Sequence, residues 1–440
     1  MTLLRSVSLN FLLRIALGLL QVLTTVELTR MMSVENYGQL SMLILNAALF
    51  NMVTSLGIDS SLTYHYSAGL VSTRNAWRTI WIFILFQVTI LLLWFLIRPL
   101  TPSAASLSLS NDGQVLLIML ALVVGTSLQD KYGALFNGSK RYSTHSITLT
   151  LAALACLITL WWYHLAGDHP QQRAGLLIYV CYALLPAMVL VMIFHVRQDT
   201  AIDPGTGIRR AMMVLAPFSM VSYLTNSIQL LAYRIDYWIL DHYHPGDPLG
   251  WYALAVRLSQ ILWFLPVVMS AIFFPEAART MGMQPARLAR AIRHLNALNL
   301  MLAALVILFS RPAIRYFFGA DYMPAAELIL ILLPGILCFA ITTLIASFMA
   351  GQNRLRVNLI GSSLCLVLVL ILDLCLIPRW GAQGAALSST VAYMCTTAYF
   401  IRAFRVRSGC TLGQLLLPTA WEFRQWPGSL KLLIKSTKLP

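Results

Sequence analysis

Charged residues are scarce in this sequence. Only 11% of its 440 residues are Asp, Glu, Lys or Arg, whereas a soluble protein carries about 25%. Acidic residues are the rarer sign, with 16 Asp and Glu against 31 Lys and Arg, while 59% of the chain is apolar. This composition excludes a soluble globular enzyme and a disordered chain, and it predicts a polytopic membrane protein. The basic excess does not indicate nucleic acid, because so apolar a chain offers no soluble basic face.

Motifs for catalysis and metal binding are also missing. The sequence has no phosphate-binding G-x-x-x-x-G-K loop, no H-E-x-x-H pair and no C-x-x-C pair among its seven cysteines. We therefore expect no catalytic residue, no metal, no cofactor and no disulfide framework. The longest outer loop, at about 99–113, carries a single carboxylate, Asp112. Such a loop is too small for a polymerase or glycosyltransferase working on the outer face, so we expect no enzyme.

Twelve stretches are long and apolar enough to cross a membrane, which takes about 20 residues per helix. The six without any charge are 79–97, 174–194, 211–233, 258–275, 328–353 and 380–401. The six weaker ones are 9–30, 38–64, 114–137, 143–164, 290–310 and 356–377. The first lacks the small-residue cleavage site of a signal peptide. We expect an all-α polytopic membrane protein with both termini on one side.

The basic residues predict which side that is. With a cytoplasmic N-terminus, the inner loops and the tail hold 21 Lys and Arg, and the outer loops hold six. Positive charge is enriched in cytoplasmic loops, so both termini are expected in the cytoplasm. Most of the net charge of +15 is therefore a topology signal and carries no information about a cargo.

Two short patterns recur at nearly the same offset and predict two related halves. Gly138 and Gly351 are followed three residues later by Arg141 and Arg354, so both pairs are 213 residues apart. Six spans per half make the repeat parallel, with two six-helix lobes around a central cavity. We expect an N-terminal lobe at 1–197, a polar linker at 198–210, a C-terminal lobe at 211–405 and a basic cytoplasmic tail at 406–440.

The seventh span carries the most regular polar pattern. Its members recur at steps of 3, 4, 3, 4 and 3, which places them on one helical face: Ser219, Ser222, Asn226, Gln229, Tyr233 and Asp236. The pattern indicates the wall of a hydrated cavity. The alternative is a set of polar contacts between packed helices. The first span has a similar stripe of Arg14, Gly18, Gln21 and Thr25, and the second carries Asn51, Ser55 and Asp59.

Charges inside the membrane are costly and therefore mark candidate functional residues. Arg14 is expected to be a cavity cation, whereas for Arg257 a position at the outer interface is an equal alternative. Cavity cations favour an anionic ligand such as a phosphate, which arginine binds bidentately. The candidate substrate-binding residues are Arg14, Gln21, Asn51, Asn226, Gln229, Arg234 and Arg257. The candidate coupling or ion-pair residues are Asp59, Asp130, Lys131, Asp236 and Asp373.

Several of these segments resemble oligosaccharide flippases of the polysaccharide transporter family, the O-antigen type. The segments are 28–38 at the junction of the first two spans, 57–62, 233–240 with 249–255, and 272–275. The resemblance extends over about residues 1–405. It implies membership of the multidrug/oligosaccharidyl-lipid/polysaccharide exporter (MOP) superfamily, two six-helix lobes and alternating access. Arg234, Asp236 and Asp59 match family positions, while Arg14 and Arg257 rest on the cavity argument. Twelve spans make a lipid II flippase less expected, since those have fourteen.

The resemblance also implies a cargo and a location. It implies a polyprenyl-pyrophosphate-linked oligosaccharide, moved from the inner to the outer leaflet of a bacterial cytoplasmic (inner) membrane for surface polysaccharide or exopolysaccharide synthesis. The expected partners are this lipid-linked substrate, membrane lipids, and a polysaccharide polymerase with its assembly proteins. Two alternatives stay open: an ion-coupled multidrug antiporter of the sister group, and a membrane assembly subunit without cargo, whose polar stripes would face neighbouring helices.

Overall fold

The chain is built from long helices. The computed structural model describes residues 3–97, 112–139, 141–165, 171–196, 207–267, 269–270, 285–352 and 354–416, and it contains no strand within these ranges. Nine of its helices are long and apolar enough to cross a membrane, or up to ten if one bent pair is a single span. This confirms an all-α polytopic membrane protein. The arrangement of twelve spans stays a prediction.

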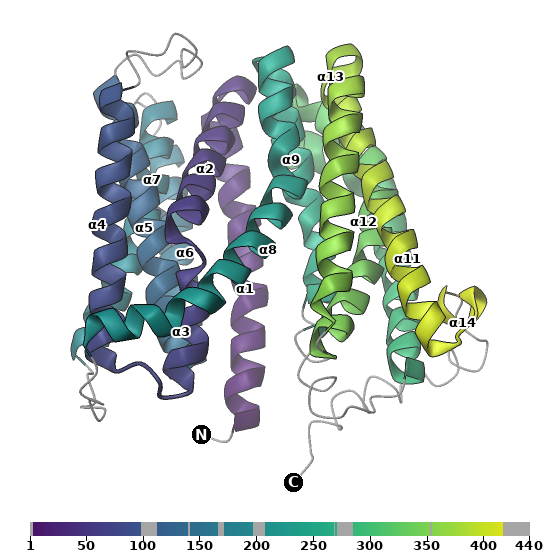
Figure 1. Ribbon diagram of the computed structural model, residues 1–440. Coiled ribbons are helices and arrows are strands. Elements are labelled where there is room, and N and C mark those ends of the chain that lie inside the picture. The colour runs from purple at the N-terminus through teal and green to yellow at the C-terminus, as the bar shows by residue number, and fades with distance from the viewer. Residues whose placement is uncertain are drawn as a thin grey trace. The chain divides into compact units, whose positions relative to one another are not determined.

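The helices divide into two compact units, Met1–Arg234 and Ile235–Pro440. Within the described residues, unit 1 contains seven helices and the first part of an eighth, whose end belongs to unit 2; Figure 1 shows their order along the chain. These elements are α1 (Leu3–Met31), α2 (Val34–Ser55), α3 (Ile58–Ser67), α4 (Thr73–Ile97), α5 (Asp112–Gly138), α6 (Tyr142–Leu165), α7 (Gln171–Val196) and α8 (Ile208–Tyr243). Its interior is apolar; one buried cluster joins Leu62, Ile80, Leu135 and Leu215 from α3, α4, α5 and α8.

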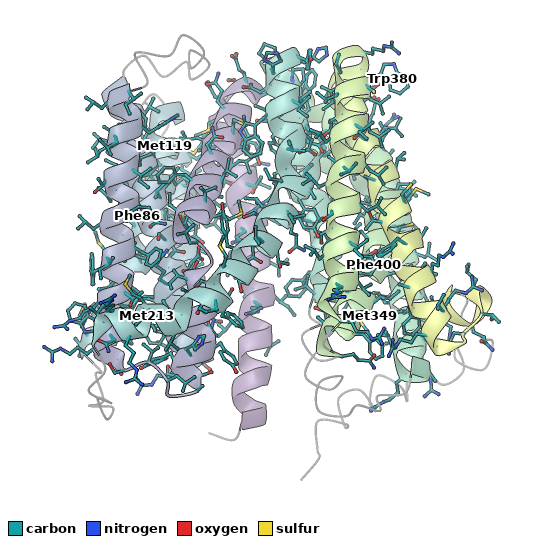
Figure 2. The ribbon with its side chains drawn as sticks, viewed as in Figure 1. Phe86, Met119, Met213, Met349, Trp380 and Phe400 are labelled. Carbon is teal, nitrogen blue, oxygen red and sulfur yellow. The ribbon has the colours of Figure 1, made fainter. Side chains whose placement is uncertain are left out.

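Unit 2 contains the end of α8 and the remaining elements. These are α9 (Asp247–Ser259), η2 (Gln260–Trp263), α11 (Pro285–Phe317), η3 (Ala320–Tyr322), α12 (Met323–Gly351), α13 (Leu355–Ser408) and the short α14 (Leu412–Leu416). Figure 2 shows Met349 and Phe400 in its interior, where both belong to a buried cluster with Leu288, Phe404 and Leu415. This cluster packs α11, α12, α13 and α14 together.

Large apolar side chains cover the outer faces of these helices. In α4, the side chain of Leu85 is 69% exposed and that of Leu96 is 74% exposed, and Phe86 also lies on the outer face (Figure 2). Such continuous apolar surface is unfavourable in water and is the normal surface of a helix in lipid. The burial pattern therefore agrees with the composition: apolar side chains cover the outside, and apolar clusters and buried polar side chains fill the inside.

The second expected span, 38–64, is broken. Helix α2 ends at Ser55, Leu56 and Gly57 adopt left-handed backbone angles (φ 48° and 72°), and α3 starts at Ile58. The two helices are bent by 55°. Leu56 is the only residue other than glycine with a positive φ among the described residues. Such an angle costs a leucine about 1 kcal/mol or more, so the surroundings must hold it.

The last two expected spans, 356–377 and 380–401, form one long element with a break. Within α13, Gly381 has non-helical angles (φ 52°, ψ −131°), so the element consists of two helical arms. Each arm is long enough to cross a bilayer. The expected span 258–275 begins with the end of α9 and the 3₁₀ turn η2; residues 271–284 lie outside the described residues.

The boundary between the two compact units lies within α8, after Arg234. From sequence we expected it in the linker 198–210, most of which lies outside the described residues. The expected lobes and linker stay predictions. Within unit 1 the first part of α8 packs against α3: the hydroxyl of Ser61 donates a 2.8 Å hydrogen bond to the carbonyl of Leu215, and Tyr64 stacks on Phe218. The internal repeat stays a prediction, as does the tail, of which residues 417–440 lie outside the described residues.

Candidate functional site

The polar stripe of α8 is buried at its two ends and open in its middle. Ser219 is buried in unit 1, and Asp236 is buried in unit 2. Between them, Asn226 and Gln229 are exposed, and the Gln229 amide donates a 2.9 Å hydrogen bond to the hydroxyl of Tyr233. Two exposed amides in the middle of a membrane helix are not explained by helix packing, because packing would bury them. They can donate and accept hydrogen bonds to a polar ligand.

In unit 2, the buried end of the stripe leads into a carboxylate site. Oδ2 of Asp236 accepts hydrogen bonds from the hydroxyl of Tyr252 and from that of Ser389, the latter at 3.3 Å. Oδ1 accepts a 2.9 Å bond from the backbone N–H of Tyr237. Helices α8, α9 and the second arm of α13 each supply a group, so the site ties three elements together.

The second carboxylate of this site is Asp373, on the first arm of α13. Its side chain is completely buried, and neither of its oxygens accepts a hydrogen bond within the described part of the chain. It lies within electrostatic range of Asp236 and beside Ser388. Two buried carboxylates repel each other, so a shared proton or a bound cation lowers the free energy of the pair. This arrangement can take up and release a positive charge.

Unit 1 holds a second polar cluster, centred on a fully buried lysine. The ammonium of Lys131 donates hydrogen bonds to Ser55 (2.7 Å) and Ser127 (2.6 Å) and pairs with Asp59 at 3.6 Å. The amide of Asn51 donates a 3.3 Å bond to Asp130. Lys131 thus has three partners around its three N–H groups, as a buried ammonium requires. Asp59 and Lys131 form an ion pair in this structure, and a coupling role for either residue stays a prediction.

A glutamine joins this cluster to one more helix, α4. Gln87 of α4 is buried, and its Nε2 lies 2.9 Å from Oδ1 of Asn51 and 3.0 Å from both Thr54 and Ser55. Its Oε1 accepts a 2.6 Å bond from Ser127. The cluster therefore connects α2, α3, α4 and α5. Asn51 is used inside the unit, and its expected contact with substrate stays a prediction.

The predicted cations take part in neither of these clusters. Arg14 is exposed on α1 and lies within electrostatic range of His145 on α6. Gln21, seven residues after Arg14 in α1, is half-buried, and so is Arg257 in α9. Neither arginine has an ion-pair partner within the described part of the chain, so both keep their full hydrogen-bonding capacity. Arg234 is half-buried at the end of unit 1 and does have contacts of its own.

Four members of these clusters were not selected from the sequence: Gln87, Ser127, Tyr252 and Ser389. Single polar residues in apolar helices are common, and nothing in the spacing of Gln87 indicates its partners. Tyr252 lies in a segment that was recognised for its resemblance, without a role for the hydroxyl. Within the described residues no group of three or more His, Cys, Asp or Glu could hold a metal ion.

Comparison with known proteins places the chain in a family. A family model described as polysaccharide biosynthesis protein matches residues 3–281. The chain therefore belongs to the polysaccharide biosynthesis protein family. No curated protein matches it at a significant level.

Solved structures show the fold. The lipid II flippase MurJ in an inward closed conformation matches with a TM-score of 0.72 at 13% identity, over 90% of this chain and 87% of that one. An inward-facing multidrug resistance MATE family transporter of the MOP superfamily matches with a TM-score of 0.70 at 12% identity, over 91% and 98%. A MATE transporter of Vibrio cholerae matches with 0.62 at 14%, over 92% and 97%. These identities show a shared fold and no shared substrate.

The class of protein follows. The chain is a multi-pass membrane protein with the fold of MOP-superfamily transporters, and it belongs to a polysaccharide biosynthesis family. The solved structures that share its fold are those of a flippase and of multidrug transporters.

Proposed function

We propose that the protein is a flippase for a polyprenyl-pyrophosphate-linked oligosaccharide. It moves this molecule from the inner to the outer leaflet of a bacterial cytoplasmic membrane by alternating access, for synthesis of a surface polysaccharide such as O-antigen or exopolysaccharide. The observation that carries the proposal is the stripe of α8, whose exposed Asn226 and Gln229 lie between two buried ends. Amides of this kind suit sugar hydroxyls, and the polysaccharide family match supports a glycan cargo.

Each part of the cargo has a candidate partner. Arg14 and Arg257 bind the pyrophosphate, since neither has an ion-pair partner in the described structure and a guanidinium matches phosphate oxygens. Arg234 is a third candidate cation. Gln21, Asn226 and Gln229 contact the sugars, and Asn51 joins them only when its bonds to Asp130 and Gln87 break. The lipid tail stays in the bilayer, where the outer faces of the helices are apolar. The protein works beside a polysaccharide polymerase and its assembly proteins, with both termini in the cytoplasm.

The energy for transport comes from an ion gradient in this account. The Asp236 and Asp373 carboxylates bind the coupling proton or cation, because a positive charge relieves the repulsion between them. Binding and release of that charge change the energy of a site that joins α8, α9 and both arms of α13. The site thereby favours one conformation of unit 2 when it is loaded and another when it is empty.

A cell-based experiment tests this function. Bacteria that depend on the protein for their surface glycan are depleted of it. Right-side-out vesicles are then prepared, and the accessibility of the lipid-linked glycan to an added lectin shows which leaflet holds it. The proposal predicts that the glycan accumulates on the inner leaflet and that surface polysaccharide is lost. If the glycan still reaches the outer leaflet at the normal rate, the proposal is wrong.

A second candidate function is an ion-coupled multidrug antiporter. Two observations favour it: the buried acid pair in unit 2 and the structural match to multidrug resistance MATE transporters. It predicts that organic cations bind and that overexpression raises drug resistance. Exposed Arg14 opposes it, because a cavity cation repels such a cargo. Resistance to cationic drugs without any effect on surface glycan would select this function over the flippase.

A further inference from the structure

The cluster around Lys131 lies at the break between α2 and α3. Ser55 is the last residue of α2, and Asp59 is the second residue of α3. Lys131 of α5 contacts both of them, with a 2.7 Å hydrogen bond to Ser55 and a 3.6 Å ion pair to Asp59. One ammonium therefore bridges the two sides of a strained turn. This bridge supplies the stabilisation that the left-handed Leu56 requires.

The two sides of the bridge differ in strength. On the α2 side the bonds are short and buried, and Gln87 and Ser127 reinforce them. On the α3 side the only bond is the ion pair, which is longer, and the Asp59 side chain is 30% exposed. Oδ1, the oxygen that pairs with Lys131, is itself buried, but water reaches the rest of the Asp59 side chain, so this carboxylate can be solvated when the pair opens. Asp59 is therefore the partner that Lys131 loses first.

A second carboxylate, that of Asp130, can replace Asp59 as the ion-pair partner of Lys131. Asp130 precedes Lys131 on α5, interacts electrostatically with both Asp59 and Lys131, and is held by the amide of Asn51. An ammonium without any counter-charge in this interior would be very costly. Exchange from one carboxylate to the other avoids that cost, so Asp130 gives the cluster a second setting.

The position of α3 affects the first part of α8, because the two helices are in contact within unit 1. Ser61 of α3 bonds to the carbonyl of Leu215, and Tyr64 stacks on Phe218 at 5.2 Å. Gly57 lies against the backbone of α8: a Cβ at this position would clash with the carbonyl oxygen of Ser219 and lie 2.7 Å from the amide nitrogen of Tyr223. The first part of α8, which carries Asn226 further along, is thus docked on α3.

We propose that Lys131 is a positioning residue of the transport cycle: it holds the break between α2 and α3, and the exchange of its carboxylate partner from Asp59 to Asp130 releases α3 together with the docked part of α8. Lys131 does not touch the cargo. It sets the position of the helix whose amides do. The inference rests on the proposed function for its role in transport, but the release of α3 is measurable without any cargo.

The first test is Asp130→Asn, with Arg78→Met on the exposed face of α4 as the matched control. Asp130 makes no bond to Lys131 in this structure, so a merely structural cluster tolerates the change. The proposal predicts an unchanged melting temperature and at least a tenfold loss of transport, because Lys131 has no second partner. The Arg78→Met variant is predicted to keep the wild-type melting temperature and wild-type transport. Full transport by Asp130→Asn overturns the proposal.

The second test removes the pair and leaves no uncompensated charge. Lys131→Met and Asp59→Asn each lower the melting temperature, by about 5 °C or more, and the double variant regains most of it. The double variant is then examined by hydrogen–deuterium exchange. The proposal predicts at least tenfold faster exchange in residues 58–67 and 208–220 than in the wild type, with residues 382–408 unchanged, and transport below a tenth of normal. Normal exchange in both segments, or transport above half of normal, overturns it.

The exchange measurement also separates the two proposals. If the wild-type protein moves no lipid-linked glycan, the proposed function fails, and faster exchange of residues 58–67 in the double variant still supports the release of α3. If the wild type does move glycan and the double variant shows both normal exchange and normal transport, the proposed function stands and the role of Lys131 is refuted.

Discussion

Asp373 and Asp236 lie within electrostatic range of each other in the buried interior of unit 2, and they are unequally supported. Asp236 accepts hydrogen bonds from Tyr252, Ser389 and a backbone amide. Asp373 accepts none from the described residues. A carboxylate without donors is unstable as an anion, so Asp373 is the member of the pair that gains most from a proton or a bound cation.

Replacement of Asp373 by Asn is therefore predicted to uncouple transport from the ion gradient while the fold is kept. The neutral amide removes the repulsion with Asp236, and the melting temperature stays equal or rises. Transport is measured in vesicles with and without an imposed proton or Na⁺ gradient, and Asp241→Asn, near the end of α8, is the control. A variant whose transport still rises with the gradient as in the wild type would remove Asp373 from coupling.

Arg14→Ala is predicted to abolish glycan export without loss of the protein from the membrane. The side chain is exposed and has no ion-pair partner within the described residues, so its removal leaves no buried partner behind. Export is read as surface polysaccharide, and the amount of protein as its level in isolated membranes. Normal export by this variant, at a normal protein level, would show that Arg14 does not bind the pyrophosphate.

The double variant Asn226→Ala, Gln229→Ala is predicted to reduce transport about tenfold or more, through weaker binding of the sugars. Each amide supplies about 0.5–1.5 kcal/mol per hydrogen bond, so two amides with one or two bonds each account for that factor. The concentration of lipid-linked glycan that gives half-maximal transport is the quantity to measure. Met220→Ala, an exposed residue elsewhere on α8, is the control and keeps normal transport.

Gly57→Ala is predicted to destabilise unit 1 by about 1–3 kcal/mol, because the backbone angle is left-handed and the added Cβ has no room against α8. The destabilisation is measured as a lower melting temperature of the purified protein. Gly18→Ala is the matched control, since Gly18 lies in α1 with nothing within 4 Å of an added Cβ. Equal melting temperatures of the two variants would show that α8 does not pack on Gly57.

Much of the fold could be predicted from the sequence because apolar length is a direct signal for a membrane helix. The spacing of Ser219, Asn226 and Asp236 also predicted a shared helical face, since a helix has a fixed period. The break at Leu56 and Gly57 was missed, because local preference disfavours a left-handed leucine, and the contacts around it come from residues distant in sequence.

The partners of buried polar residues were the other part that sequence could not supply. Asp59 and Lys131 were both predicted from the sequence, but their contact with each other depends on how α3 and α5 pack together. Gln87 has no periodic neighbour in α4 and gave no signal at all. The division of the chain within α8 depends in the same way on contacts between α3 and α8 that are distant in sequence.

The most direct test of the account is the movement of a lipid-linked glycan by the purified protein. The protein is reconstituted into liposomes that carry a fluorescent polyprenyl-pyrophosphate oligosaccharide, and the fraction reached by an added glycosidase is followed with time. The account predicts that the wild type makes the inner-leaflet pool accessible when an ion gradient is imposed, and that Arg14→Ala leaves it protected. If the inner-leaflet pool stays protected in liposomes that contain the wild type, as it does in protein-free liposomes, the proposed flippase function is wrong.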